Sequence, residues 1–433
     1  MNNFNNHRWM SVILLALWTL DGCIGEFVFQ IGGLGVYFHL PIMGLIIFLG
    51  GFTFLVNPHL GRAKVLTVQA LILLVPVLLP IVWSLFVWIV TSAGISGIRR
   101  GFVRAGYVFF GILAIAATAY TAGEKVTGIY LFSLVAANIL IVIRVISEDG
   151  VVIFFTEFAE LIISFAQTTG TTMKKLEIHR ITYGLGPFIV AYFVKGSRMK
   201  RIRWMLPAAL FCYLTGFKRI GVAAVLASIV AAAAISAMRK YNAGRRFFLR
   251  MIGVIFILLA LLYVAAVYFG LYDYLEQIGI NTNLRSYIYS LFQPYYRISP
   301  FFLGQGTGWV DDIFRNIEEG VSQELEGVAY NTHNDYLRSY IELGMIGFLA
   351  WCYTRFNFQV SHSYRKLGIH GGTLAFALTM YMAITCATDP TSLQVYINCS
   401  IAAILFGFRL ETRERWEERK MEIRNRRYGE QYC

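Results

Sequence analysis

The chain has 433 residues, of which 57% are hydrophobic and only 15% are charged. Soluble globular domains average about 45–50% apolar and about 25% charged residues, so this composition excludes an ordinary soluble domain and indicates a polytopic membrane protein. The net charge of +13 comes from short basic clusters between apolar stretches, which is typical of cytoplasmic loops and does not predict nucleic-acid binding. The six cysteines show no CxxC spacing, so neither a disulfide framework nor a zinc site is expected.

The first part of the chain alternates apolar stretches with short polar turns. These stretches lie at about 10–29, 34–56, 65–91, 106–121, 127–146 and 151–169, each near the roughly 20 residues that a helix needs to cross a bilayer. Segments that span a membrane in this way should be helices, because every backbone polar group must be satisfied internally. The side of the membrane on which the N-terminus lies stays open.

Basic loops set the orientation of the second part. Lys195–Arg203 and Arg239–Arg250 are the strongest basic clusters, which places both in the cytoplasm. Apolar stretches alternate around them, at about 181–194, 204–217, 219–238, 247–270, 336–354, 372–387 and 392–408. The turn Gly216–Arg219 and the loop 271–332 should then lie outside, and the span of about 336–354 should run inward to a boundary at Arg355 and Lys366.

Together these patterns predict an all-α polytopic membrane protein with about 12–14 transmembrane helices. Residues 1–433 form a single integral membrane domain in this interpretation. The large extracytoplasmic loop covers residues 271–332, and residues 409–433 form a basic cytoplasmic tail.

The stretch Asn331-Thr-His333-Asn334-Asp335-Tyr336-Leu337 lies where the long loop re-enters an apolar helix. Asn334 or Asp335 can cap that helix by accepting hydrogen bonds from its first N–H groups. Ionisable residues near bilayer depth are costly and mark functional sites by default. His333 is therefore the first candidate for chemistry, with a capping or packed histidine as the alternative.

Basic residues on the outer side stand out against the positive-inside bias. They are Arg180, Lys218, Arg219, Arg285 and Arg297. Guanidinium groups match the paired oxygens of phosphates, so these cations around one histidine suit an anionic substrate. Each also has a structural alternative, since Arg285 can hold the loop by hydrogen bonds and Arg219 can be an interfacial anchor.

Two other patterns in the loop allow a functional and a structural interpretation. Gly304-x-Gly306-x-Gly308 can cradle phosphate through backbone N–H groups, but no strand–helix unit surrounds it, which favours a plain tight turn. The acidic residues between Asp311 and Glu326 lack the spacing of an EF-hand. They predict a solvated helix on the outer face rather than a metal site.

His333-Asn-Asp-Tyr-Leu337, followed by Glu342-Leu-Gly344-Met-Ile-Gly347-Phe, resembles the signature of the O-antigen ligase and Wzy-type polymerase superfamily. The resemblance extends over the C-terminal half, from about Arg180 onward. Members of this family join lipid-linked glycans on the outer side of the bacterial cytoplasmic membrane. The resemblance implies an all-α bundle related to the GT-C glycosyltransferases that needs neither a metal nor a cofactor.

The resemblance also implies roles for individual residues. A family arginine follows a Thr-x-Ser-like turn at the start of a small-residue helix, which corresponds here to Thr215–Gly221. Lysine stands where serine is usual, so either Lys218 or Arg219 contacts the diphosphate. A second family arginine opens the long loop, at the place of Arg285. The implied catalytic residues are His333, Arg285 and Arg219, and the implied substrate-binding residues are Lys218, Arg180, Arg297, Asn334 and Asp335.

The implied activity is that of a metal-independent, inverting glycosyltransferase with a lipid-linked donor. It would polymerise undecaprenyl-diphosphate-linked repeat units into O-antigen, capsular polysaccharide or exopolysaccharide, at the periplasmic or extracellular face of the inner membrane. An O-antigen ligase that transfers the glycan to lipid A core or to a protein is the alternative, although Thr385–Pro390 looks more like the polymerases. The implied partners are the carrier-linked glycan, a glycan or lipid acceptor, the bilayer, a chain-length regulator and a flippase.

A polysaccharide transporter is the competing class. Its mark would be charged or helix-breaking residues at mid-span in two symmetric halves. Pro76, Pro80, Glu157 and Glu160 are not mirrored in the second half, so the sequence favours the enzyme.

Overall fold

The computed structural model shows an all-α protein. It describes residues 8–27, 35–91, 97–163, 179–195, 202–216, 218–238, 242–280, 282, 285–320 and 332–430, and at some helix ends, Arg180 among them, it describes the backbone only. The described residues form helices and no strands. Many of these helices are long and apolar enough to cross a membrane, so the predicted all-α polytopic membrane fold is confirmed.

The helices before residue 200 form the first part of the bundle. They are α1 (Arg8–Phe27), α2 (Gly35–Val56), α3 (Leu60–Thr91), α4 (Ile98–Ala122), the short η3 (Gly123–Lys125), α5 (Val126–Asp149), α6 (Val151–Ile163) and α8 (His179–Lys195). The helices after residue 200 complete it. They are α9 (Leu206–Thr215), α10 (Arg219–Ala237), α11 (Asn242–Tyr268), α12 (Leu271–Gln277), α13 (Arg285–Phe292), η6 (Gln293–Tyr295), α14 (Trp309–Gly320), α15 (Asp335–Cys352), the π-helical η7 (Tyr353–Phe358), α16 (Gln359–Cys386) and α17 (Val395–Glu430).

Seven stretches of the described residues meet the length and apolarity of a membrane span. Two of them, Ile98–Asp149 and Asp335–Cys386, are 52 residues long, more than twice the roughly 20 residues of one crossing. The first is interrupted at Gly123 and the second at Gly344 and Gly368, all glycines with φ near +65°. The stretch predicted at 151–169 contains α6, whose 13 residues are too few to cross alone, and the residues after Ile163 lie outside the described part.

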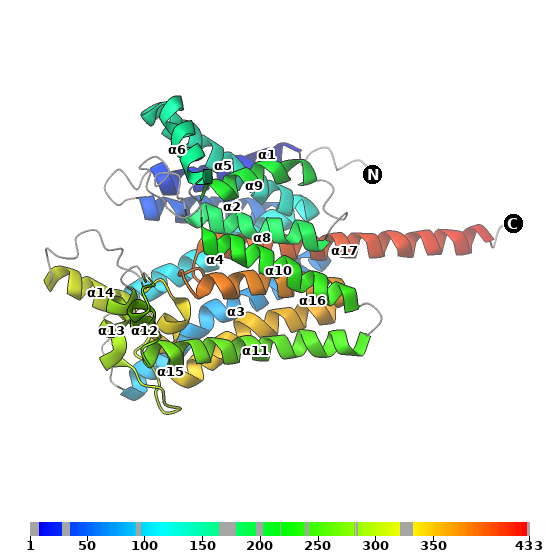
Figure 1. Ribbon diagram of the computed structural model, residues 1–433. Coiled ribbons are helices and arrows are strands. Elements are labelled where there is room, and N and C mark those ends of the chain that lie inside the picture. Colours follow the sequence, from blue (N-terminus) through cyan, green and yellow to red (C-terminus); the bar gives the residue numbers. More distant parts are fainter. Residues whose placement is uncertain are drawn as a thin grey trace.

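The long helices lie side by side, and the elements of the 271–332 loop gather at one end of the bundle (Figure 1). There α12, α13 and α14 lie beside the beginning of α15. At the opposite end α17 extends well beyond the other helices. The predicted tail 409–433 is therefore, as far as Glu430, a continuation of the α17 helix.

A segment of the loop fills a break in α15. The break is at Gly344, whose φ of 66° and ψ of −174° are not helical. Across it the Gln305 N–H donates to Ile341 O (3.0 Å), the Gly306 N–H to Glu342 O (2.8 Å) and the Met345 N–H to Phe302 O (2.9 Å). Backbone groups released inside a membrane protein need such partners. The Gly304–Gly308 turn thus packs its backbone against α15, which agrees with the tight-turn interpretation.

Replacing Gly344 with alanine is expected to destabilise the protein strongly. A Cβ at this position would lie 2.1 Å from Phe302 O, and the left-handed conformation alone costs a residue with a side chain about 1–2 kcal/mol. Thermal unfolding in detergent measures the effect. Gly44→Ala is the control, because a Cβ at Gly44 meets nothing within 4 Å. Equal unfolding temperatures for the two variants would contradict the expectation.

Arg355 lies inside the bundle, so the prediction that it marks the inner boundary is wrong. The helix continues through η7 into α16, and the Arg355 side chain is buried. Its Nη1 donates to Asn398 Oδ1 (2.9 Å) and its Nη2 to Ser392 O (2.8 Å). These acceptors replace water around the guanidinium group, which makes a cation tolerable at this depth.

Candidate active site

Several segments that are distant in sequence meet at Thr388 and Asp389, in the connection between α16 and α17. His333 Nδ1 lies 3.6 Å from Asp389 Oδ1. The Tyr183 hydroxyl donates to Asp389 Oδ2 at 2.5 Å. Arg285 Nη2 donates to Thr388 O at 3.4 Å. Arg285, a predicted outer-side residue, therefore converges with His333 on one short segment.

His333 has an unusual backbone conformation. Its φ of 45° is the one positive φ of a non-glycine residue in the described part of the chain. Such strain concentrates at functional sites. The next residue, Asn334, caps α15, because its Oδ1 accepts hydrogen bonds from the N–H groups of Tyr336 and Leu337, both at 3.1 Å. The cap fixes the histidine at the start of the helix, with its side chain 32% exposed.

Asp389 is placed to orient the His333 ring. Burial raises the pKa of the Asp389 carboxyl group, but the neighbouring His333, the hydrogen bond from Tyr183 and the charge of Lys218 outweigh burial and lower that pKa below its usual value. The carboxylate is therefore charged at neutral pH. A carboxylate facing Nδ1 favours the tautomer with a proton on Nδ1, which leaves Nε2 as the proton acceptor.

Two cations lie at the Thr388–Asp389 segment. Lys218 is the N-cap residue of α10 and is one of the charges that lower the pKa of Asp389. Arg285 is half-buried at the first position of α13. Arg219 follows Lys218 as the first residue of α10, with an exposed side chain. Positive charge thus reaches the site from the starts of two helices, where the helix dipoles add to it.

The remaining predicted residues take different places. Asn334 and Asp335 are buried, and Asp335 Oδ2 accepts a hydrogen bond from the Ser392 N–H at 2.7 Å. Both side chains hold the backbone in place through these contacts, and their role in substrate binding stays a prediction. Arg297 is exposed, and its carbonyl accepts a hydrogen bond from the Tyr340 hydroxyl at 2.9 Å. The side chain of Arg180 lies outside the described residues.

A buried ionic cluster attaches α14 to the bundle. Asp311 accepts from Arg338 Nη2 through Oδ2 (2.6 Å) and from Arg104 Nη1 through Oδ1 (3.0 Å), and Arg338 Nε lies 3.4 Å from Glu342 Oε1. Asp311 is only 6% exposed, so the interpretation of its helix as fully solvated is wrong. The burial of Asp311 could not be predicted from the sequence, because the two arginines that pair with it come from α15 and α4.

Residues 204–352 match the family model described as O-antigen ligase. The resemblance to the O-antigen ligase and polymerase superfamily is confirmed over these residues. No curated protein matches the chain. The described helices are long and apolar enough for a multi-pass membrane protein, and the match supports a glycosyltransferase of the ligase or polymerase type.

The matched segment contains Lys218, Arg285 and His333, whereas Tyr183 and Asp389 lie outside it. The sequence analysis did not identify these last two as site residues. The available signal for Asp389 was an acidic residue, next to Pro390, at the outer end of an apolar stretch. Tyr183 carried no signal, because a tyrosine in an apolar helix is ordinarily a packing residue.

Proposed function

We propose that this protein is a polymerase that extends undecaprenyl-diphosphate-linked oligosaccharide on the outer face of the bacterial cytoplasmic membrane. The observation that carries the proposal is the position of His333, with Asp389 at Nδ1, the charge of Lys218 acting on that carboxylate, and Arg285 on the neighbouring carbonyl of Thr388. This arrangement pairs a proton acceptor with cations that suit a diphosphate leaving group. The reaction it supports is direct transfer of a glycan from a lipid diphosphate to a hydroxyl group.

In this reaction the acceptor hydroxyl attacks the anomeric carbon of the lipid-linked glycan. His333 Nε2 takes the proton of that hydroxyl as general base, and Asp389 stabilises the imidazolium ion that forms. The new bond joins the acceptor oxygen to the anomeric carbon, and the bond from that carbon to the diphosphate oxygen breaks. A single displacement of this kind inverts the anomeric configuration.

The departing diphosphate gains negative charge as the glycosidic bond breaks. Arg285 offers the paired donors that match phosphate oxygens, and Lys218 adds a compact point charge. Cations fixed in place before the reaction stabilise such developing charge without reorganisation. This proposed chemistry is metal-independent, because neutralisation of the diphosphate is assigned to the two side chains.

A ligase uses the same donor chemistry with another acceptor, and the family match carries the description O-antigen ligase. The two functions differ in the acceptor hydroxyl alone. A polymerase accepts a second lipid-linked repeat unit, whereas a ligase accepts lipid A core oligosaccharide or a protein. The Thr385–Pro390 segment, which resembles that of the polymerases, favours the first.

The test uses the purified protein in nanodiscs with lipid-diphosphate-linked repeat units, and products are separated by chain length. We expect wild type to produce a ladder and Arg285→Ala to lose it, with a rate at least about 10²-fold lower because charge stabilisation is removed. Arg144→Ala is the matched control, since Arg144 pairs with Glu148 on the surface of α5.

Three other outcomes would overturn parts of the proposal. Transfer that occurs solely after lipid A core or a protein acceptor is added would establish the ligase. Movement of the lipid-linked glycan across the membrane with unchanged linkage would establish a transporter. A ladder from Arg285→Ala equal to that from Arg144→Ala would remove Arg285 from the site.

A further inference from the structure

We propose that Tyr183 is a positioning residue of this site, whose hydroxyl holds the Asp389 carboxylate in the orientation that Asp389 needs to align His333. Nothing in the family match covers Tyr183, which lies before its first residue. The inference deepens the proposed function and rests on it where it concerns the rate of transfer. Its structural part, the hold of Tyr183 on Asp389, stands on geometry alone.

The two oxygens of Asp389 have separate partners. Oδ1 faces His333 Nδ1 at 3.6 Å, and Oδ2 accepts the hydrogen bond from the Tyr183 hydroxyl at 2.5 Å. Thr388 Oγ1 also reaches Oδ2, at the longer distance of 3.5 Å. Because a carboxylate is planar, fixing Oδ2 also fixes the direction in which Oδ1 points. Tyr183 therefore sets the angle at which Asp389 meets the imidazole.

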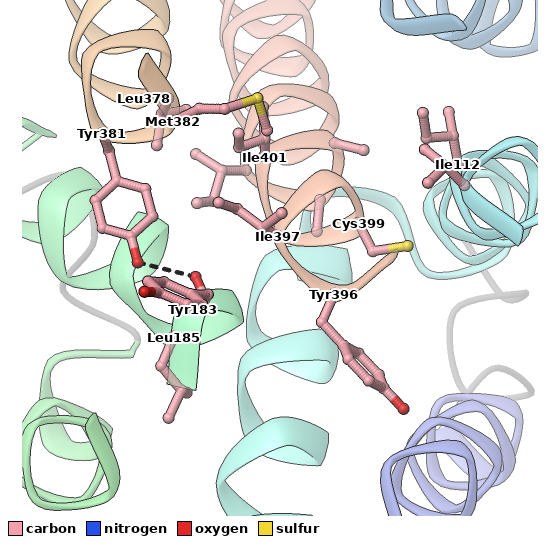
Figure 2. Close-up of a cluster of buried hydrophobic side chains, with 14 of the residues drawn as sticks. Ile112, Tyr183, Leu185, Leu378, Tyr381, Met382, Tyr396, Ile397, Cys399 and Ile401 are labelled. Carbon is pink, nitrogen blue, oxygen red and sulfur yellow. Dashed lines mark hydrogen bonds between the residues drawn. The ribbon is translucent and has the colours of Figure 1, made fainter. Parts of the chain in front are cut away.

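Tyr183 is itself held firmly. Its side chain is completely buried in the core, and its carbonyl accepts a hydrogen bond from the Tyr381 hydroxyl at 3.1 Å, the dashed line in Figure 2. Tyr381 can approach α8 because residue 186 is glycine, where a Cβ would lie 2.2 Å from the Tyr381 hydroxyl oxygen. A tyrosine fixed in this way can serve as a rigid reference point for Asp389.

The charged and titratable groups that face Asp389 come from four directions. His333 lies before α15, Tyr183 is on α8, Lys218 is at the start of α10, and Arg285 on α13 contacts the carbonyl of the preceding residue, Thr388. Lys218 and His333 act on the carboxylate through charge, whereas Tyr183 adds a short directional hydrogen bond. If the Tyr183 hydroxyl were removed, the hydrogen bond from Thr388 Oγ1 would be the one that remains to Asp389 Oδ2 among the described contacts.

The test is Tyr183→Phe, which removes one oxygen atom and keeps the ring. A hydrogen bond to a charged carboxylate typically moves its pKa by about one unit. Without the bond, Asp389 should bind a proton at a pH about one unit higher, and the poorer alignment of His333 should lower kcat/KM for glycan transfer. Tyr336→Phe is the matched control, because it removes a buried hydroxyl that donates to Ala383 O and not to Asp389.

A second measurement does not depend on glycan transfer. Infrared difference spectra recorded against pH report the carbonyl stretch of a protonated carboxylic acid, and Asp389→Asn identifies the band that belongs to Asp389. We expect this band to appear at higher pH in Tyr183→Phe than in wild type. An unmoved band in Tyr183→Phe, or an equal shift in Tyr336→Phe, would overturn the positioning role.

The two readouts separate the two proposals. A shifted band in a protein that transfers no glycan would uphold the contact and reject the proposed function. In an active protein, a double-mutant cycle adds a further criterion. If Tyr183 acts through Asp389, Tyr183→Phe should lower kcat/KM by less than about twofold in the Asp389→Asn background. Losses that multiply would show that Tyr183 acts independently and would overturn the inference.

Discussion

Replacing His333 with alanine is expected to lower kcat/KM for glycan transfer at neutral pH by about 10²–10⁴-fold, the usual contribution of a general base. The variant retains Lys218, Arg285 and Asp389, so binding of the lipid diphosphate should change much less than the rate. The measurement is the product ladder of the nanodisc assay, together with the affinity for the lipid-linked donor.

The control for this variant is His59→Ala. His59 is exposed and lies just before α3, and its N–H donates to the Tyr120 hydroxyl, a bond that the substitution keeps. Thermal unfolding of both variants shows whether the fold is intact. Loss of transfer with an unchanged unfolding temperature supports the general-base assignment. A ladder from His333→Ala within a few-fold of wild type would remove it.

Replacing Arg338 with methionine is expected to produce the largest loss of stability. The substitution keeps much of the side-chain volume but removes the ion-pair partner of Glu342 and leaves Asp311 with Arg104 alone. Both carboxylates are less than 9% exposed. Breaking a buried ion pair by removing one partner typically costs about 3–5 kcal/mol, because a buried charge is left uncompensated. Thermal unfolding in detergent measures the change in stability.

Arg415→Met is the matched control for Arg338→Met. Arg415 pairs with Glu411 four residues earlier on α17 at 2.7 Å, but its side chain is 56% exposed. Exposed pairs of this kind contribute about 0.3–0.5 kcal/mol. Similar unfolding temperatures for the two variants would show that the Asp311 cluster does not stabilise the fold. A large drop for Arg338→Met should also release α14 from α15, which proteolysis of the loop would detect.

Much of the fold follows from the sequence because a bilayer imposes simple demands. The apolar stretches are enough to predict the helical class. The charge bias of the basic loops is enough to predict which segments lie together on the outer side. Arg355 and Asp311 were placed wrongly for one reason. In the sequence alone a charged residue is taken to be exposed to solvent, because its buried partners lie in distant segments. These partners are Asn398 and Ser392 for Arg355, and Arg338 and Arg104 for Asp311.

The site residues that belong to a sequence motif were predictable, whereas those that only the fold brings together were not. His333 and Arg285 follow from the resemblance and from their places on the outer side. Asp389 and Tyr183 are 206 residues apart, and no spacing relates them. Gly304 and Gly344 show a similar limit of the sequence. Each could be recognised as a turn or motif residue, but their contact with each other could not be predicted. That the two segments interlock follows only from their hydrogen bonds.

The place of Asp389 in the chain has a consequence for biogenesis. The connection that bears it precedes the final helix, so Tyr183, Lys218, Arg285 and His333 are all synthesised earlier. A nascent chain in the translocon therefore contains His333, Lys218 and Arg285 before Asp389, the carboxylate near which they lie, has been synthesised. On the proposed mechanism, transfer can begin only after the segment that carries Asp389 has been synthesised, so a chain that stops before Asp389 does not consume carrier-linked sugar.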